Sequence, residues 1–287
     1  MDINKGSEQW SSKLFRVVNS TVCFSMAYIT ITFLHWMTMS SIGKFFKFDS
    51  FVYYYGIKFV LNGAYWNRLN ISFIYGGGAL FFLLYGLFSF YLFDKLRNFK
   101  SVLNLFLLWG FIIGTALFCV QIVVAAIGYG EYNSPYYQGL AVVFAWVRIP
   151  IFIVYALVVP FAILYAYFVV HYGKPVLRLA YSFTRVNKLS RRRMFFLETI
   201  IVPFLIGSVG VTALTFPMNL FIHLTYMVAI LVGIVGTYIA MPYIEVLKDD
   251  VLRYKNLQKL NIVFMVFLGL MVGFVIITFK GLFMSAT

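Results

Sequence analysis

Apolar residues form seven long stretches of the chain, and the short segments between them hold most of the charged residues. A helix needs about 20 apolar residues to cross a hydrocarbon core roughly 30 Å thick, and each stretch is long enough. The pattern predicts an all-α polytopic membrane protein with about seven transmembrane helices in a single transmembrane domain, residues 1–287. The predicted helices cover approximately residues 17–40, 71–93, 102–128, 138–170, 195–216, 219–242 and 261–283.

The fourth stretch, residues 138–170, is too long for one straight helix perpendicular to the membrane. It contains Pro150 and Pro160. A proline inside a helix removes a backbone donor and clashes with the preceding turn. We therefore expect a kinked or tilted helix there.

In the segment between the first two helices, large apolar residues recur at every second position, which is the period of a β-strand and not of a helix. Asn62–Gly63 follows it directly, and this dipeptide is typical of a type I′ turn. The pattern predicts a short aromatic β-hairpin over about residues 45–68, lying in the outer membrane interface where aromatic rings with polar tips concentrate. An irregular aromatic loop that covers the bundle is the alternative. The alternating residues are Phe51, Tyr53, Tyr55, Ile57, Phe59 and Leu61.

Composition narrows the class of protein further. Hydrophobic residues make up 62% of the chain and charged residues only 11%, whereas soluble domains are about 25% charged. Too few charges remain to cover a surface that faces water on all sides. A soluble enzyme, a disordered chain and a disulfide-stabilised secreted domain are thereby excluded.

The net charge of +14 arises from basic residues that are unevenly distributed among the loops. Seventeen Lys and Arg residues lie in the segments that share a side with the N-terminus, and five lie on the other side. Because cytoplasmic loops are enriched in basic residues, we expect an inner (plasma) membrane protein with a cytoplasmic N-terminus. Contact with anionic lipid headgroups explains the positive charge. The sequence contains no basic domain outside the membrane segments that could bind nucleic acid.

The loop 171–193 is the most basic segment of the chain. Apolar residues interspersed with the charges are typical of an amphipathic segment that contacts anionic lipid headgroups. A docking site for an acidic cytoplasmic partner is the alternative. The candidate contact residues are Lys174, Arg178, Arg185, Lys188, Arg191, Arg192 and Arg193.

Polar residues inside the predicted helices are costly in lipid and usually functional. His35, Gln121, Arg148 and His223 all fall in the outer half of their helices, and we treat them as a candidate intramembrane polar site. Arg148 lies about ten residues inside its helix, so we expect it to be buried toward the bundle. Glu198 lies near the inner end of the fifth helix, where pairing with one of the arginines 191–193 is expected.

Motifs for enzymatic chemistry are missing from the sequence. It contains no Cys-x-x-Cys pair, no phosphate-binding loop and no recognisable Ser-His-Asp set, so no catalytic residue, metal ligand or cofactor is assigned. The one alternative is a b-type haem held by His35 and His223, because imidazoles serve as axial ligands.

A family resemblance covers about a quarter of the chain, residues 25–95. The segment His35–Trp36–Met37–Thr38–Met39, the aromatic hairpin and Gly76–Gly77–Gly78 follow one another in an order similar to that of site-2-protease-like intramembrane zinc metalloproteases. Those enzymes carry His-Glu-x-x-His, whereas this chain has Trp36 and Met39 at the Glu and second His positions. The resemblance implies a catalytically degenerate relative. The segments Leu105–Trp109 and Arg191–Gly207 also resemble those of uncharacterised bacterial multi-pass inner-membrane proteins, which implies no function.

Three functional hypotheses follow. The first is a non-enzymatic integral subunit or scaffold of a larger membrane complex, with other membrane proteins as partners; small-residue spacings such as Gly110 and Gly114 favour close helix packing. The second is a transporter or channel that uses the polar site in the outer half of the bilayer. The third is a haem- or metal-binding membrane subunit.

Overall fold

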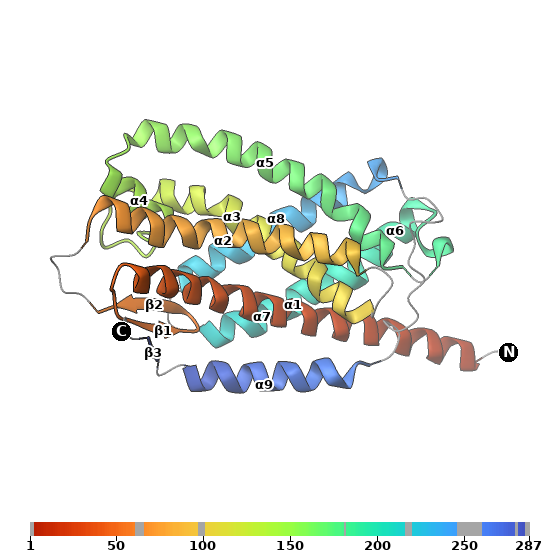
Figure 1. Ribbon diagram of the computed structural model, residues 1–287. Helices are drawn as coiled ribbons and strands as arrows, with labels where there is room; N and C mark the ends of the chain where they lie inside the picture. The colour runs from red at the N-terminus through yellow and green to blue at the C-terminus, as the bar shows by residue number, and fades with distance from the viewer. Residues whose placement is uncertain are drawn as a thin grey trace.

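The computed structural model describes residues 3–60, 66–96, 101–180, 182–215, 220–245, 260–278 and 281–284. Helices account for most of this part of the chain, and one small sheet lies at an end of the bundle (Figure 1). The longer helices are α1 (Ile3–Phe45), α2 (Arg68–Lys95), α3 (Ser101–Gly128), α5 (Ile151–Arg178), α7 (Val202–Thr215), α8 (Leu220–Ala240) and α9 (Ile262–Thr278). The shorter elements are α4 (Leu140–Val147), η1 (Phe183–Arg185), α6 (Leu189–Phe196), η2 (Leu197–Ile201), η3 (Met241–Tyr243), β1 (Ser50–Tyr53), β2 (Gly56–Phe59) and β3 (Leu282–Met284).

Six helical segments of the described chain are long and apolar enough to cross a membrane, and α9 adds a shorter apolar helix of 17 residues. At 1.5 Å per residue α9 extends about 25 Å, at the lower limit for a span. The prediction of an all-α polytopic fold with a small aromatic hairpin is confirmed.

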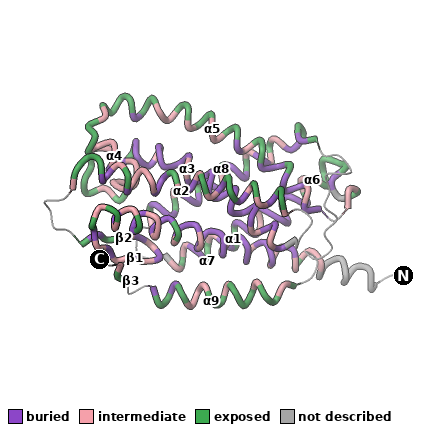
Figure 2. Tube along the Cα trace, viewed as in Figure 1, coloured by how far each residue is buried: buried purple, intermediate pink, exposed green. Residues whose placement is uncertain are grey.

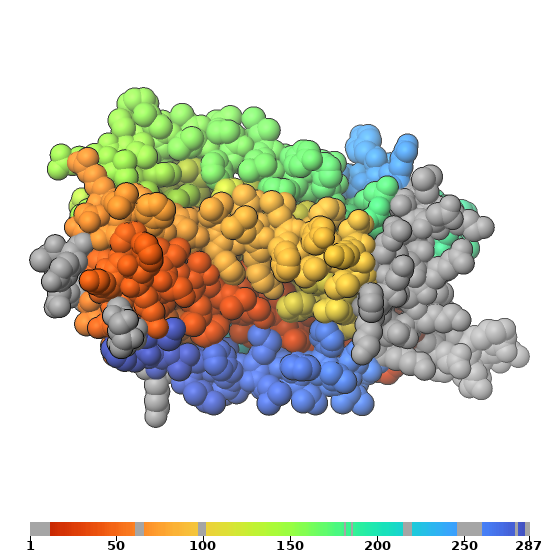
Figure 3. Space-filling model, in the orientation of Figure 1, coloured from red at the N-terminus to blue at the C-terminus, as the bar shows by residue number. Residues whose placement is uncertain are grey.

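Helix α3 forms the centre of the bundle. It contacts α1, α2, α5 and α8, and most of its residues are buried. The outward faces of α5 and α9 are largely exposed (Figure 2), as expected of helices that meet lipid. α9 runs along one edge of the molecule and packs chiefly against α1 (Figures 1 and 3).

The fourth apolar stretch is two helices and not one kinked helix. Arg148 ends α4 with a left-handed backbone (φ 63°), and Pro150 caps the start of α5. Since a residue that precedes proline avoids the helical region, the helix ends before Pro150. Pro160, in contrast, is accommodated inside α5.

The fifth stretch contains a π-helical turn, η2, between α6 and α7. Pro203 follows this turn and has no N–H for the carbonyl of Thr199, four residues earlier. The hydroxyl of Ser20 on α1 donates to that carbonyl at 2.5 Å. A side chain of the neighbouring helix thus satisfies the acceptor that the proline leaves open.

The hairpin turns at Tyr54–Tyr55, between β1 and β2, which pair antiparallel from Ser50↔Phe59 to Tyr53↔Gly56. The predicted turn position was therefore wrong; residues 62 and 63 lie outside the described part. A third strand, β3, pairs with β1 and was not predicted. The sheet packs on the ends of α1 and α2 through Val52 and Phe59.

Candidate functional site

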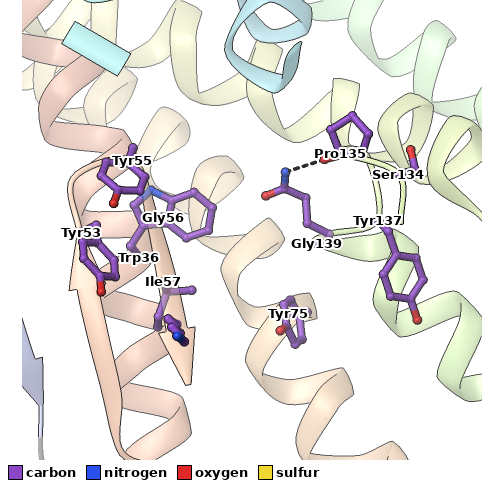
Figure 4. A pocket seen from close by; sticks show the side chains of 12 residues that line it. Trp36, Tyr53, Tyr55, Gly56, Ile57, Tyr75, Ser134, Pro135, Tyr137 and Gly139 are labelled. Carbon is purple, nitrogen blue, oxygen red and sulfur yellow. Dashed lines mark hydrogen bonds between the residues drawn. The ribbon is translucent and has the colours of Figure 1, made fainter. Parts of the chain in front are cut away.

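A cavity of about 490 Å³ opens between the hairpin and the loop that connects α3 to α4 (Figure 4). Tyr53, Tyr55, Gly56 and Ile57 line one side, and the α3–α4 loop lines the other. Trp36 of α1 lies beside the hairpin, and Tyr75 of α2 lies between the two sides. The remaining lining residues are Lys58, Ser134, Pro135, Tyr137, Gln138 and Gly139.

Packing beneath the hairpin fixes the first side of this cavity. The hydroxyls of Ser40 on α1 and Ser50 on β1 share a hydrogen bond of 2.7 Å. The ring of Phe59 occupies the space above Gly43, where a Cβ would lie 2.6 Å from it. These contacts fix the position of the strands on α1. Tyr53 and Tyr55 of the hairpin stack on each other with ring centroids 5.1 Å apart.

The loop side of the cavity is held by short local hydrogen bonds. Ser134 accepts from the backbone N–H of Tyr136 at 3.2 Å, and the amide of Gln138 donates to the carbonyl of Pro135 at 3.0 Å. Tyr137 packs edge-on against Tyr132. A loop stabilised in this way presents a defined wall, as a binding site requires.

The polar groups of the lining include two that only donate, the indole of Trp36 and the ammonium of Lys58, and several hydroxyl and amide groups that donate and accept. The indole N–H of Trp36 and the hydroxyl of Tyr137 are buried and have no partner among the described residues. Burial raises the pKa of Tyr137, as it does that of Tyr55, so both phenols stay protonated at neutral pH. Lys58 is the one charged residue among those that line the cavity.

Behind the cavity, three of the four predicted intramembrane residues are buried and joined by aromatic residues that the sequence did not single out. His35 bonds through Nδ1 to the carbonyl of Gly78 at 2.9 Å. His223 shares a hydrogen bond of 2.6 Å with the hydroxyl of Tyr28, and Gln121 donates to that of Tyr226 at 2.8 Å.

Phe82 and Tyr226 connect these pairs into one buried network. The ring of Phe82 stacks on His35 at 4.2 Å and meets Tyr226 edge-on, which in turn contacts His223. The two imidazoles are thus separated by packed rings. A haem held between them requires this aromatic packing to be displaced.

The network reaches the cavity at two points. Trp36 in the cavity wall contacts the imidazole of His35 with ring centroids 4.4 Å apart. Gly139, also in the wall, lies against Gln121: a Cβ there would be 2.5 Å from its Oε1. Two residues of the cavity wall therefore contact the buried network directly, so a movement of the wall is transmitted to its polar groups.

Arg148 does not belong to this group. It caps the C-terminal end of α4, between the two helices, where its side chain is exposed. The expectation of burial was wrong because it assumed a continuous helix through this position.

At the opposite end, Glu198 pairs with α1 and not with the arginine triplet. Its carboxylate accepts from Arg16 at 2.6 Å and lies 3.6 Å from the ammonium of Lys13. Arg16 is only 2% exposed and also lies over the ring of Phe195. The π-helical turn places Glu198 in this buried ion pair.

The basic loop uses several of its arginines to hold its own fold. Arg178 bonds to Asp94 at 3.1 Å, Arg191 to the carbonyl of Thr184 at 2.7 Å, and Arg193 lies over the ring of Tyr238. Arg192 donates to the carbonyls of Val186 and Ile244, each at 2.5 Å. Lys174 and Lys188 are exposed, and the side chain of Arg185 lies outside the described part.

A second, apolar cavity of about 630 Å³ lies between α1 and α2. Its hydroxyl residues, Thr38 and Ser41, bond to carbonyls of their own helix. The groove therefore offers only apolar surface, which suits lipid chains.

Within the described residues, no group of three or more His, Cys, Asp or Glu side chains is placed to hold a metal ion. No protein-family model, curated protein or solved structure matches the chain. The fold defines a polytopic helical protein with membrane-length spans, and its function has to be argued from the site alone.

Proposed function

We propose that this chain is a multi-pass inner-membrane protein with a cytoplasmic N-terminus, which binds a small molecule from the outer side in the cavity beneath the hairpin. The observation that carries the proposal is the cavity itself: about 490 Å³, within the usual range for small ligands, with five aromatic side chains and a few polar groups in its wall. The uneven distribution of Lys and Arg residues supports the orientation.

The chemistry of the lining favours binding over catalysis. Its residues include no carboxylate, imidazole or thiol, the groups that most often act as general bases or nucleophiles near neutral pH. Aromatic faces and phenol or indole donors instead hold and orient a ligand. A non-enzymatic role is therefore the interpretation that this site supports.

The packing behind the cavity distinguishes a binding site from an open channel. Phe82, Tyr226 and Gln121 fill the space between the cavity and the bundle centre and are buried or nearly so. Transport through this route requires those side chains to move. We therefore propose binding as the function, because in this conformation the route through the bundle is filled by side chains.

Binding is tested with 2-naphthol, a flat probe suited to an aromatic wall, by calorimetry on protein in nanodiscs with empty nanodiscs as the blank. We expect saturable one-to-one binding. The variant Ser134→Trp fills the cavity and should weaken binding at least tenfold. Ser182→Trp carries the same substitution at the opposite end of the bundle and should bind like the wild type. Equal binding by both variants contradicts the proposal.

A second function, that of a subunit in a larger membrane complex, is favoured by one observation. Of the 17 residues of α9, only Val275 and Thr278 are buried. This helix is held along α1 and by the pairing of β3 with β1, and presents the rest of its apolar surface outward.

The subunit hypothesis is tested with a photo-crosslinking amino acid at Val266 on α9 and, for comparison, at Val209 on α7; both residues are exposed. A single protein partner that is crosslinked from Val266 and co-purifies at equal stoichiometry supports it. Crosslinks to lipid alone from both positions contradict it.

A further inference from the structure

The outer cavity combines one basic side chain with indole, hydroxyl and amide groups. Trp36 and Tyr137 contribute buried N–H and O–H groups that lack partners in the described chain, and Lys58 contributes an ammonium. Lys58 is exposed, so its ammonium is the group within reach of an anionic acceptor.

The net charge of the described residues at this end of the molecule is positive, like the charge of Lys58. Among the described residues near the hairpin and the outer helix ends, Lys44, Lys47, Lys58, Arg68 and Arg148 are basic, and only Asp49 and Glu131 are acidic. Clefts beneath a surface of one sign concentrate ions of the opposite sign. No acidic residue of the lining offsets Lys58.

The aromatic side chains specify the rest of the ligand. The rings of Trp36, Tyr53, Tyr55, Tyr75 and Tyr137 surround the space, and flat apolar frames pack well against such faces. An aromatic cage that binds cations uses the same rings, but a cation here meets Lys58 and no counter-charge in the lining.

Resting on the proposed function, we infer that the cavity binds an anion, a carboxylate or phosphate attached to a flat apolar body, with Lys58 as the residue that selects its charge. The anionic group lies toward Lys58 at the exposed edge of β2, and the apolar body lies between the rings.

Three probes with one frame test the charge: 2-naphthoate, 2-naphthamide and 2-naphthylmethylammonium, each titrated at pH 7 into protein in phosphatidylcholine nanodiscs. We expect naphthoate to bind about fivefold more tightly than the amide, the size of effect given by a solvent-exposed charge pair, and the ammonium to bind most weakly. The preference should shrink in high salt.

Variants separate Lys58 from the general field. Lys58→Gln should abolish the preference for naphthoate without changing amide binding, and Lys58→Arg should retain it. Lys47→Gln removes an equal charge outside the cavity lining and should have little effect. In phosphatidylglycerol nanodiscs, weaker binding of the neutral amide identifies a lipid headgroup that occupies the cavity, since surface charge alone weakens only naphthoate. Unchanged amide affinity identifies a soluble anion.

The outcomes distinguish this inference from the proposed function. If the amide or the ammonium binds as tightly as naphthoate, or if Lys58→Gln keeps the preference, the anion assignment is wrong while binding stands. If none of the three probes binds and 2-naphthol does not bind either, the proposed function itself fails.

Discussion

At the residue scale, Gly139 couples the cavity wall to the buried network. Its backbone has φ +57° and ψ −128°, a conformation that side chains with a Cβ rarely adopt, and a Cβ would lie 2.5 Å from Oε1 of Gln121. Gly139→Ala should therefore lower the free energy of unfolding by about 1–3 kcal/mol from backbone strain, and more from the clash. SDS titration of the purified protein measures this loss.

Gly130 is the matched control, since it also has positive φ (+80°) but no atom within 4 Å of the added Cβ. Gly130→Ala reports backbone strain alone. If it destabilises the protein as much as Gly139→Ala does, the contact with Gln121 contributes nothing.

Arg16 and Glu198 form a buried ion pair, and we expect its removal to lower the stability of the protein. The two groups are 2.6 Å apart, and Arg16 is almost fully buried. Removing the carboxylate takes a close counter-charge away from the buried guanidinium, so Glu198→Gln should reduce stability by about 3 kcal/mol. The midpoint of SDS unfolding should shift accordingly.

The exposed pair Arg178–Asp94 gives the comparison for this prediction. The side chain of Asp94 is 58% exposed, and Asp94→Asn should cost less than about 1 kcal/mol. Similar shifts for both variants would show that the Arg16–Glu198 pair is no stronger than a surface pair.

Residue-level prediction from the sequence succeeded or failed for identifiable reasons. Polar residues in apolar stretches are conspicuous, so His35, Gln121 and His223 were selected. Their partners Tyr28 and Tyr226 were not, because the chain has 21 tyrosines and nothing in spacing distinguishes those two. Glu198 was assigned to arginines near in sequence, whereas its partner Arg16 is 182 residues away.

At the element scale, hydrophobic length predicted the helices, but local backbone features were harder to predict. Pro150 in a long apolar stretch predicts a kink, whereas in the structure one helix ends before it and a new helix begins after it. The π-helical turn before Pro203 depends on a hydroxyl from another helix, Ser20, which periodicity does not reveal. Strand β3 pairs with β1 across more than 200 residues, and its three residues carry no strand pattern.

Close packing of α2 and α3 depends on glycine at their crossing. A Cβ at Gly114 would lie 2.7 Å from the carbonyl oxygen of Phe82 and 2.8 Å from the Cα of Gly86. Since both are backbone atoms, the helices have to separate to admit it. Gly114→Ala should lower unfolding stability by about 1–3 kcal/mol.

Gly210→Ala controls for helix propensity, because nothing lies within 4 Å of its added Cβ. Alanine is the better helix former, so this variant should be neutral or slightly stabilising. Stability that changes alike in both variants would rule out close packing at Gly114 as the cause.

At the scale of the whole molecule, the two ends differ in what they present. The hairpin, α4 and β3 lie together at one end, while α6 and the start of α1 lie at the other (Figure 1). The cavity belongs to the first end and the basic loop to the second. The proposed ligand site and the basic loop lie at opposite ends, as the proposed orientation requires, with the cavity outside and the basic loop beside the anionic lipid of the inner leaflet.

The orientation itself can be tested by cysteine labelling of intact cells. Ser190 and Asn133 are both exposed and lie at opposite ends of the bundle, and the two native cysteines, Cys23 and Cys119, are buried and should react little. With a cytoplasmic N-terminus, Asn133→Cys should react with a membrane-impermeant maleimide added outside. Ser190→Cys should react only after the cells are opened, because the proposed orientation places the side with 17 basic residues in the cytoplasm. The reverse pattern would place the cavity in the cytoplasm and overturn both the orientation and the external source of the ligand.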